Sequence, residues 1–145
     1  MRFDDILAGS RYRIATAEVE RDAVVRFAAE WDPQPFHLSD EGARANPLMG
    51  RLSASGWQTV LLMQMACDSF VRSTGLVGLA GGGVDEIRWL RPVFPPERLT
   101  IWLTFADARA SRSRPELGIV TFRLDAYGLD STQVATMAIK GFFAR

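Results

Sequence analysis

The chain has 145 residues, of which 48% are hydrophobic and 23% charged, and its 17 basic and 17 acidic residues give a formal net charge of zero. A chain without excess positive charge lacks the field that attracts nucleic acid or anionic lipid, so we expect neither partner. One histidine and one cysteine are too few for a structural zinc site, which needs about four such ligands. We expect no metal and no other cofactor.

The length and even composition predict one domain spanning residues 1–145. Cys67 has no partner for a disulfide, and the first ten residues carry two aspartates where a signal peptide carries basic residues. The longest apolar segment, residues 57–71, is interrupted by polar side chains and is shorter than the ~20 residues that span a bilayer. We therefore expect a cytoplasmic protein without a membrane segment.

The amino-terminal half predicts one strand and three helices. Residues 11–19 have the alternation of a half-buried strand, and apolar residues at helical spacing follow over residues 24–31. That helix must end near Trp31, because the residue before a proline is pushed out of helical geometry. Ser39 can cap a short helix over residues 40–45. Residues 56–72 carry apolar side chains on nearly every face, which predicts a helix surrounded by protein.

The carboxyl-terminal half predicts an antiparallel run of strands. Four segments rich in β-branched and aromatic residues are separated by turn signals. They are residues 84–90, 99–108, 119–127 and 133–143. The three glycines at 81–83 precede the first strand instead of opening a helix, so we expect a flexible connection and no phosphate loop. The order of elements predicts an α+β fold, with a curved antiparallel sheet wrapped around the central buried helix.

Asp32 and His37 are the first candidates for chemistry. They lie five residues apart in Asp-Pro-Gln-Pro-Phe-His, where two prolines restrict the backbone between them. A carboxylate and an imidazole held in this way can act as a general base and acid. The alternative is a simple turn, with His37 as a hydrogen-bonded structural residue.

The second candidate is the start of the long helix, at residues 53–57. Its unpaired amides can stabilise a developing oxyanion, and glycine at position 56 lets a substrate approach the backbone. The alternative is that Ser53 or Ser55 only caps the helix. Arg88 or Arg91 is a further candidate for contact with a substrate phosphate, and the sequence does not choose between them.

Three stretches in this order resemble the MaoC-like dehydratases, the hotdog-fold family that includes the (R)-specific enoyl-CoA hydratases. The hydratase motif, Asp-x-Asn-Pro-aliphatic-His-x-acid after an aromatic residue and before an alanine, is similar to Phe27, residues 32–40 and Ala43. Residues 54–57 stand where the family has a His-Gly-Met-like helix start, and residues 83–93 resemble its strand that leads into a Pro-Val turn.

The resemblance implies a hotdog fold and (R)-specific hydration of trans-2-enoyl thioesters, or in reverse dehydration of 3-hydroxyacyl thioesters, as in fatty acid metabolism. Asp32 and His37 would be the catalytic pair holding a water, and the Gly56 amide would be the oxyanion donor. The expected substrate contacts are Gln34, Pro35, Phe36, Ser55 and Trp57. The acyl group would be carried by coenzyme A or by an acyl carrier protein.

The resemblance also implies a homodimer, or a larger assembly of dimers, with its sites at the interface. Gln34 replaces the asparagine of the motif, Pro33 is an additional constraint, and Phe36 is bulkier than the usual aliphatic residue. Two other functions stay open: a hotdog acyl-CoA thioesterase, and a non-catalytic module that binds acyl thioesters.

Overall fold

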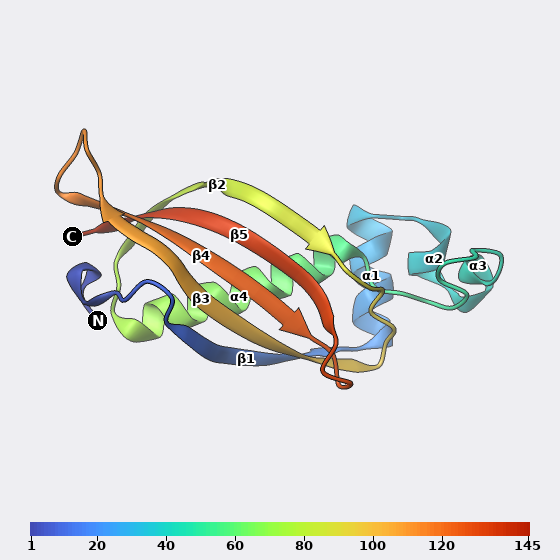
Figure 1. The fold of residues 1–145 in the computed structure, drawn as a ribbon. Coiled ribbons are helices and arrows are strands. Elements are labelled where there is room, and N and C mark those ends of the chain that lie inside the picture. Colours follow the sequence, from blue (N-terminus) through green and yellow to red (C-terminus); the bar gives the residue numbers. More distant parts are fainter.

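The computed structural model describes residues 1–145 and contains a five-stranded antiparallel sheet packed on one long helix (Figure 1). The strands are β1 (Arg11–Val19), β2 (Gly78–Trp89), β3 (Glu97–Ala110), β4 (Leu117–Tyr127) and β5 (Gln133–Ala144). They lie in the order β1-β3-β4-β5-β2, so β1 and β2 form the two edges of the sheet. The predicted α+β architecture is confirmed.

Five helical segments accompany the sheet. They are the 3-10 turn η1 (Phe3–Asp5) and the helices α1 (Arg21–Trp31), α2 (Pro35–Leu38), α3 (Asp40–Arg44) and α4 (Gly56–Thr74). Helices α1 to α3 gather at one end of the sheet, and both chain termini lie near the opposite end (Figure 1). No helix is both long enough and apolar enough to cross a membrane.

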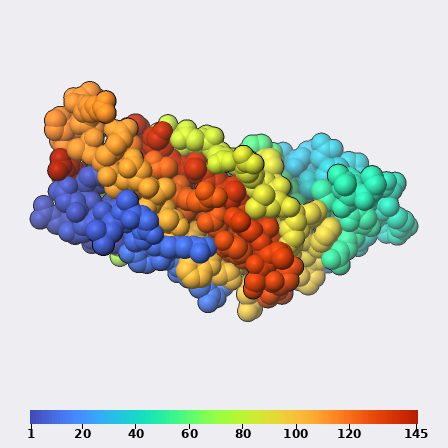
Figure 2. All heavy atoms as spheres, in the orientation of Figure 1, coloured from blue at the N-terminus to red at the C-terminus, as the bar shows by residue number.

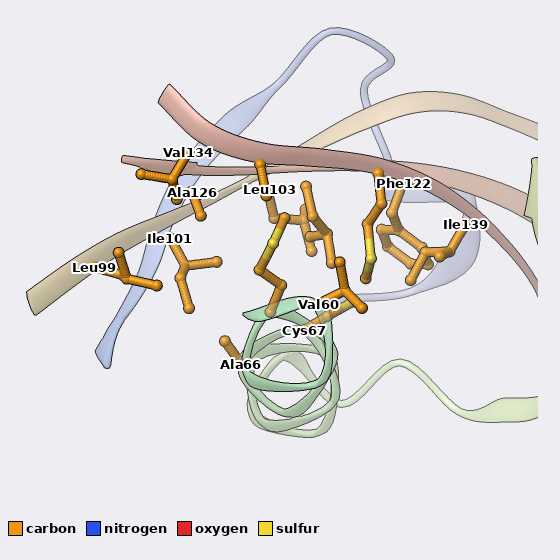
Figure 3. Close-up of a cluster of buried hydrophobic side chains, with 14 of the residues drawn as sticks. Val60, Ala66, Cys67, Leu99, Ile101, Leu103, Phe122, Ala126, Val134 and Ile139 are labelled. Carbon is orange, nitrogen blue, oxygen red and sulfur yellow. The ribbon is translucent and has the colours of Figure 1, made fainter. Parts of the chain in front are cut away.

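The core lies between α4 and the sheet face turned towards it (Figure 3). Strand β3 shows why, because Leu99, Ile101, Leu103 and Phe105 alternate with less buried neighbours and are themselves fully buried. Side chains of successive strand residues point to opposite faces, so these four meet the helix together. Burying each of them contributes about 1.5–3 kcal/mol.

The prediction of a flexible connection at residues 81–83 is wrong, because all three glycines lie inside β2. The pairing of β2 with β5 is interrupted by three register shifts, at 78/80, 81/83 and 84/86, and Gly83 has φ 132°. Glycine adopts such a backbone without the strain that a Cβ would add. The glycines therefore allow an irregular edge strand.

The prediction that α4 is surrounded by protein is also wrong for the single chain. One face of α4 packs on the sheet through residues such as Val60, Met63 and Cys67. The opposite face carries Leu61 and Met65, whose exposed fractions are 54% and 67%. Sequence periodicity identifies apolar faces, but it does not say which of them the chain itself covers.

Candidate active site

The end of α1 and the start of α2 bring Asp32 and His37 together. Asp32 caps the carboxyl end of α1, and Pro35 occupies the first turn of α2. Nε2 of His37 lies 3.5 Å from Oδ2 of Asp32, and the imidazole is buried. We did not predict α2, although proline at the first helical position is a known signal of a helix start.

The backbone of Ser53 fixes the orientation of the His37 ring. Nδ1 lies 2.7 Å from the carbonyl oxygen of Ser53, and the Ser53 amide donates to the carbonyl of Phe36 at 3.0 Å. Because a carbonyl can only accept, this contact assigns the proton to Nδ1. A second proton on the ring would therefore lie on Nε2, the nitrogen that faces Asp32.

Ser55 connects the catalytic candidates to the start of α4. Its hydroxyl donates to Oδ2 of Asp32 at 2.7 Å and accepts from the Trp57 amide at 3.2 Å as the N-cap of α4. Of the two serines that we considered as caps, Ser55 is therefore the one that caps. The Gly56 amide donates to no other group in the chain.

Gly56 is required by packing against Trp89. A Cβ at position 56 would overlap the indole ring of Trp89, which also contacts the Trp57 ring edge-on at 5.2 Å between centroids. We expected this glycine to leave room for a substrate, but the space beside its Cα is filled by the indole. Gly56 can therefore contact a ligand through its backbone amide, but there is no room for a ligand beside its Cα.

These groups share a cavity of about 460 Å³. Its lining residues come from the residue that follows α1, from α2, the loop after α3, the start of α4, the end of β2 with the segment after it, and the start of β5: Asp32, His37, Leu48, Met49, Ala54, Gly56, Trp57, Thr59, Trp89, Leu90, Arg91, Pro92, Val93 and Val134. A mostly apolar cavity with a few convergent polar groups is typical of small-molecule sites. Its volume lies within the usual range of about 300–1,000 Å³.

The structure separates the predicted substrate contacts into two groups. Trp57 lines the cavity, and Ser55 lies behind Asp32 as its hydrogen-bond donor. Gln34, Pro35 and Phe36 are not among the lining residues. Gln34 is the exposed N-cap of α2, while the Phe36 ring packs edge-on against the His37 imidazole at 4.5 Å.

Leu48, Met49 and Trp89 are cavity residues that sequence reasoning missed. Leu48 is 81% exposed in the loop after α3, and a large apolar side chain in a loop beside Asn-Pro is a signal that could have been used. Trp89 gave no such signal, because an aromatic residue at the end of a strand is common. Its position beside Gly56 depends on the pairing of β2 with β5.

The structure distinguishes Arg91 from Arg88. Arg91 lines the cavity, and its guanidinium bonds to Glu97 at 2.7 Å and to Asp130 at 3.1 Å. The hydrogen bond to Glu97, followed by the charge of the same carboxylate, raises the pKa of Arg91. Arg88 pairs with Glu86 on the exposed edge strand. Arg91 therefore holds the β4–β5 turn against the segment after β2.

No protein-family model matches the chain. Among curated proteins, the uncharacterized protein YdeM of Bacillus subtilis (strain 168) is 30% identical over 139 residues, which cover 92% of each chain. Among solved structures, the MaoC-like dehydratase from Rhodospirillum rubrum is 32% identical, with a TM-score of 0.83 over 98% of this chain and 95% of that chain.

The fold and these similarities define a hotdog-fold protein, and the chain belongs to the MaoC-like dehydratase family. More distant structures have the same fold. The (R)-hydratase from A. caviae involved in PHA biosynthesis is 17% identical, with a TM-score of 0.72 over 94% of this chain and 96% of that chain. At such low identity, the similarity between this hydratase and the chain shows only that the two proteins share a fold.

Proposed function

We propose that the chain is one MaoC-like hotdog domain that catalyses (R)-specific hydration of trans-2-enoyl thioesters, and the reverse dehydration. The observation that carries the proposal is the close approach of Asp32 and His37 beside the unpaired amide of Gly56, in one cavity. A base, an acid and an oxyanion donor are the three groups that addition of water to an enoyl thioester requires. The similarity to the MaoC-like dehydratase from Rhodospirillum rubrum, at 32% identity, supports this reaction class.

In the proposed mechanism, a water lies between Asp32 and His37, and the thioester carbonyl accepts a hydrogen bond from the Gly56 amide. The Asp32 carboxylate takes one proton of the water as the water oxygen bonds to C3. Protonated His37 gives the proton on Nε2 to C2, and proton transfer from Asp32 to His37 restores the pair. The product gains one hydroxyl at C3 and one hydrogen at C2, so the atoms balance.

Substitution of each member of the pair tests the proposal. We expect Asp32→Asn and His37→Ala each to lower the rate of hydration of crotonyl-CoA, or of a longer enoyl-CoA, by about 10²-fold or more, since each proton transfer contributes about 10²–10⁴. Asp107→Asn, an exposed carboxylate on β3, is the matched control and should keep full activity. Near wild-type hydration by both site variants would refute the mechanism.

Two further measurements, made beside the hydration assay, separate the other two functions. Release of free thiol from an acyl-CoA without hydration would identify a thioesterase. Calorimetric binding of acyl-CoA without turnover on any chain length would identify a binding module. A panel of acyl-CoA and acyl-carrier-protein substrates of increasing chain length then determines the acyl group and its carrier.

We further propose that the protein is a homodimer formed through β2 and the outer face of α4. Exposed apolar residues gather on these two elements: Trp57, Leu61 and Met65 on α4, and Leu79, Val84 and Trp89 on β2. The three on α4 are four residues apart and share one helix face. Exposed apolar residues grouped on neighbouring elements in this way are typical of a protein–protein interface.

The oligomeric state checks the interface. Light scattering coupled to gel filtration should give twice the mass of the 16.1 kDa chain. Met65→Lys should shift the mass towards the monomer, because it places a charge on the proposed contact. Leu129→Lys, which changes an equally exposed apolar residue of the β4–β5 turn, should remain dimeric. A dimer that is unaffected by Met65→Lys would place the interface elsewhere.

A further inference from the structure

A second hollow lies on the sheet face turned away from α4, which is the face that Figure 2 presents. It has a volume of about 430 Å³, and we call it the outer hollow. Its lining residues come from β1, β3, β4 and the β4–β5 turn: Arg11, Arg13, Thr100, Trp102, Tyr127, Gly128 and Ser131. None of them lines the candidate active site, so the outer hollow is separate from it.

Two unneutralised positive charges face the outer hollow. The side chains of Arg11 and Arg13 form no ion pair. By contrast, eight other arginines, Lys140 and His37 each have a nitrogen within 4 Å of a carboxylate oxygen. No acidic residue lines the outer hollow. Asp125 lies on the same face, directly opposite Trp102 on the neighbouring strand, but its carboxylate is paired with the guanidinium of Arg123 at 3.5 Å. The outer hollow therefore carries a local positive charge on a chain of zero net charge.

The aromatic residues hold Arg11 in a defined position. Its guanidinium carbon lies 4.6 Å from the centroid of the Trp102 ring and 5.8 Å from that of Tyr127. One terminal nitrogen donates to the Tyr127 hydroxyl at 3.1 Å. A guanidinium has five N–H groups, so stacking leaves most of them free to donate in the plane of the group. An arginine fixed in this way loses less conformational entropy when it binds an anion.

Neutral donors complete the outer hollow. Thr100 and Ser131 line the outer hollow together with the two arginines, and their hydroxyls make no hydrogen bond within the chain. The backbone of Ser131, in the turn that bounds the outer hollow, has φ 63°, a left-handed conformation that residues other than glycine seldom adopt. Two guanidinium groups, two free hydroxyls and an aromatic surface together match a phosphate group attached to a small organic molecule.

We propose that the outer hollow binds the phosphate group of a small organic phosphate, with Arg11 and Arg13 as its charged donors. The organic part would lie along the exposed edges of Trp102 and Tyr127. This proposal does not depend on the hydratase reaction, because the two sites share no residue.

Isothermal titration of the intact protein with AMP tests the proposal, with adenosine and inorganic phosphate as comparison probes. We expect saturable AMP binding that inorganic phosphate competes away and that weakens with added salt, and we expect no binding of adenosine. Arg11→Gln and Arg13→Gln should each weaken AMP binding about tenfold or more, since a charge-assisted hydrogen bond is lost. Arg112→Gln, another arginine without an ion pair, in the loop between β3 and β4, is the matched control.

Three results would overturn the assignment. They are the absence of saturable AMP binding at millimolar concentration, adenosine binding as tight as that of AMP, and wild-type affinity in both arginine variants. Enoyl-CoA hydration by Arg13→Gln, measured in parallel, should equal that of the wild-type protein. Loss of hydration in Asp32→Asn with AMP binding retained would show that the two sites are independent.

Discussion

The Ser55 hydroxyl donates a 2.7 Å hydrogen bond to Oδ2 of Asp32, the same carboxylate oxygen that faces Nε2 of His37 at 3.5 Å. Ser55, at the start of α4, therefore holds the Asp32 carboxylate in position next to the His37 imidazole. Ser55 also caps α4, so one side chain links the position of the carboxylate to the helix whose first amide is the proposed oxyanion donor.

We predict that Ser55→Ala lowers kcat for enoyl-CoA hydration by about tenfold while KM stays nearly constant, because Asp32 loses its orienting donor and not a substrate contact. The lost cap should also cost about 1 kcal/mol of unfolding free energy. Ser55→Thr keeps the hydroxyl and should restore most of the rate. Ser73→Ala, which removes a hydroxyl at the other end of α4, is the control. A large rise in KM would instead show that Ser55 contacts the substrate.

We predict that Gly56→Ala destabilises the protein and lowers its activity, because the added methyl group overlaps the Trp89 indole. In a Trp89→Leu background, the same substitution should cost less. Thermal unfolding of the two single variants and the double variant gives the coupling energy, expected at about 1 kcal/mol or more for residues in direct contact. Additive effects of the two substitutions would contradict the contact.

We predict that Asp40 stabilises the fold at neutral pH and ceases to do so in acid. The Leu52 amide, at 2.9 Å, and then the Arg21 guanidinium, at 2.6 Å, hold the pKa of the Asp40 carboxyl below its ordinary value of 3.8. A carboxyl whose pKa is lowered by folding contributes stability above its unfolded pKa and loses it as the pH falls through the folded value.

Urea unfolding at several pH values checks this. At pH 7, Asp40→Asn should unfold at a lower urea concentration than the wild-type protein, and the gap should close as the pH falls below about 3.8. Asp107→Asn should show a much smaller difference at pH 7. A gap that is the same at pH 7 and pH 3 would show that the ionised carboxylate is not the stabilising form.

We predict that Cys67 does not react in the folded protein. Burial on the core face of α4 raises the pKa of this thiol to about 12, with a smaller contribution from the charge of Asp68. Only the thiolate is nucleophilic, so a disulfide reagent should find no reactive thiol at pH 8. One equivalent should react once guanidinium chloride unfolds the chain. Stoichiometric labelling of the native protein within minutes would contradict the burial.

Local signals predicted most of the fold. The turn residues bound β3, β4 and β5, and Gly75, with φ 82°, ends α4 just beyond the predicted boundary. The start of β2 could not be predicted, because it is rich in glycine and glycine has a low propensity for strands. Its place is set by pairing with β5, which is distant in the sequence.

Local signals also predicted part of the candidate site. The two prolines between Asp32 and His37 indicated a rigid pair, and the structure places the two side chains together. The contact between His37 and the Ser53 carbonyl was not predictable, because every residue has a backbone carbonyl and the residue type at position 53 therefore gives no signal. The contact of Trp89 with Gly56 depends on the whole sheet. Sequence therefore indicated the candidate catalytic side chains better than the groups that hold them in position.

Strand β2 also bears on how the chain avoids aggregation. An exposed edge strand with apolar side chains can add further chains without limit and so start a fibre. Its three register shifts break the straight ladder that such growth needs, and Asp85, Glu86 and Arg88 place charges along the same edge. The irregularity that the glycines permit thus makes β2 a poor template for the addition of strands from other chains.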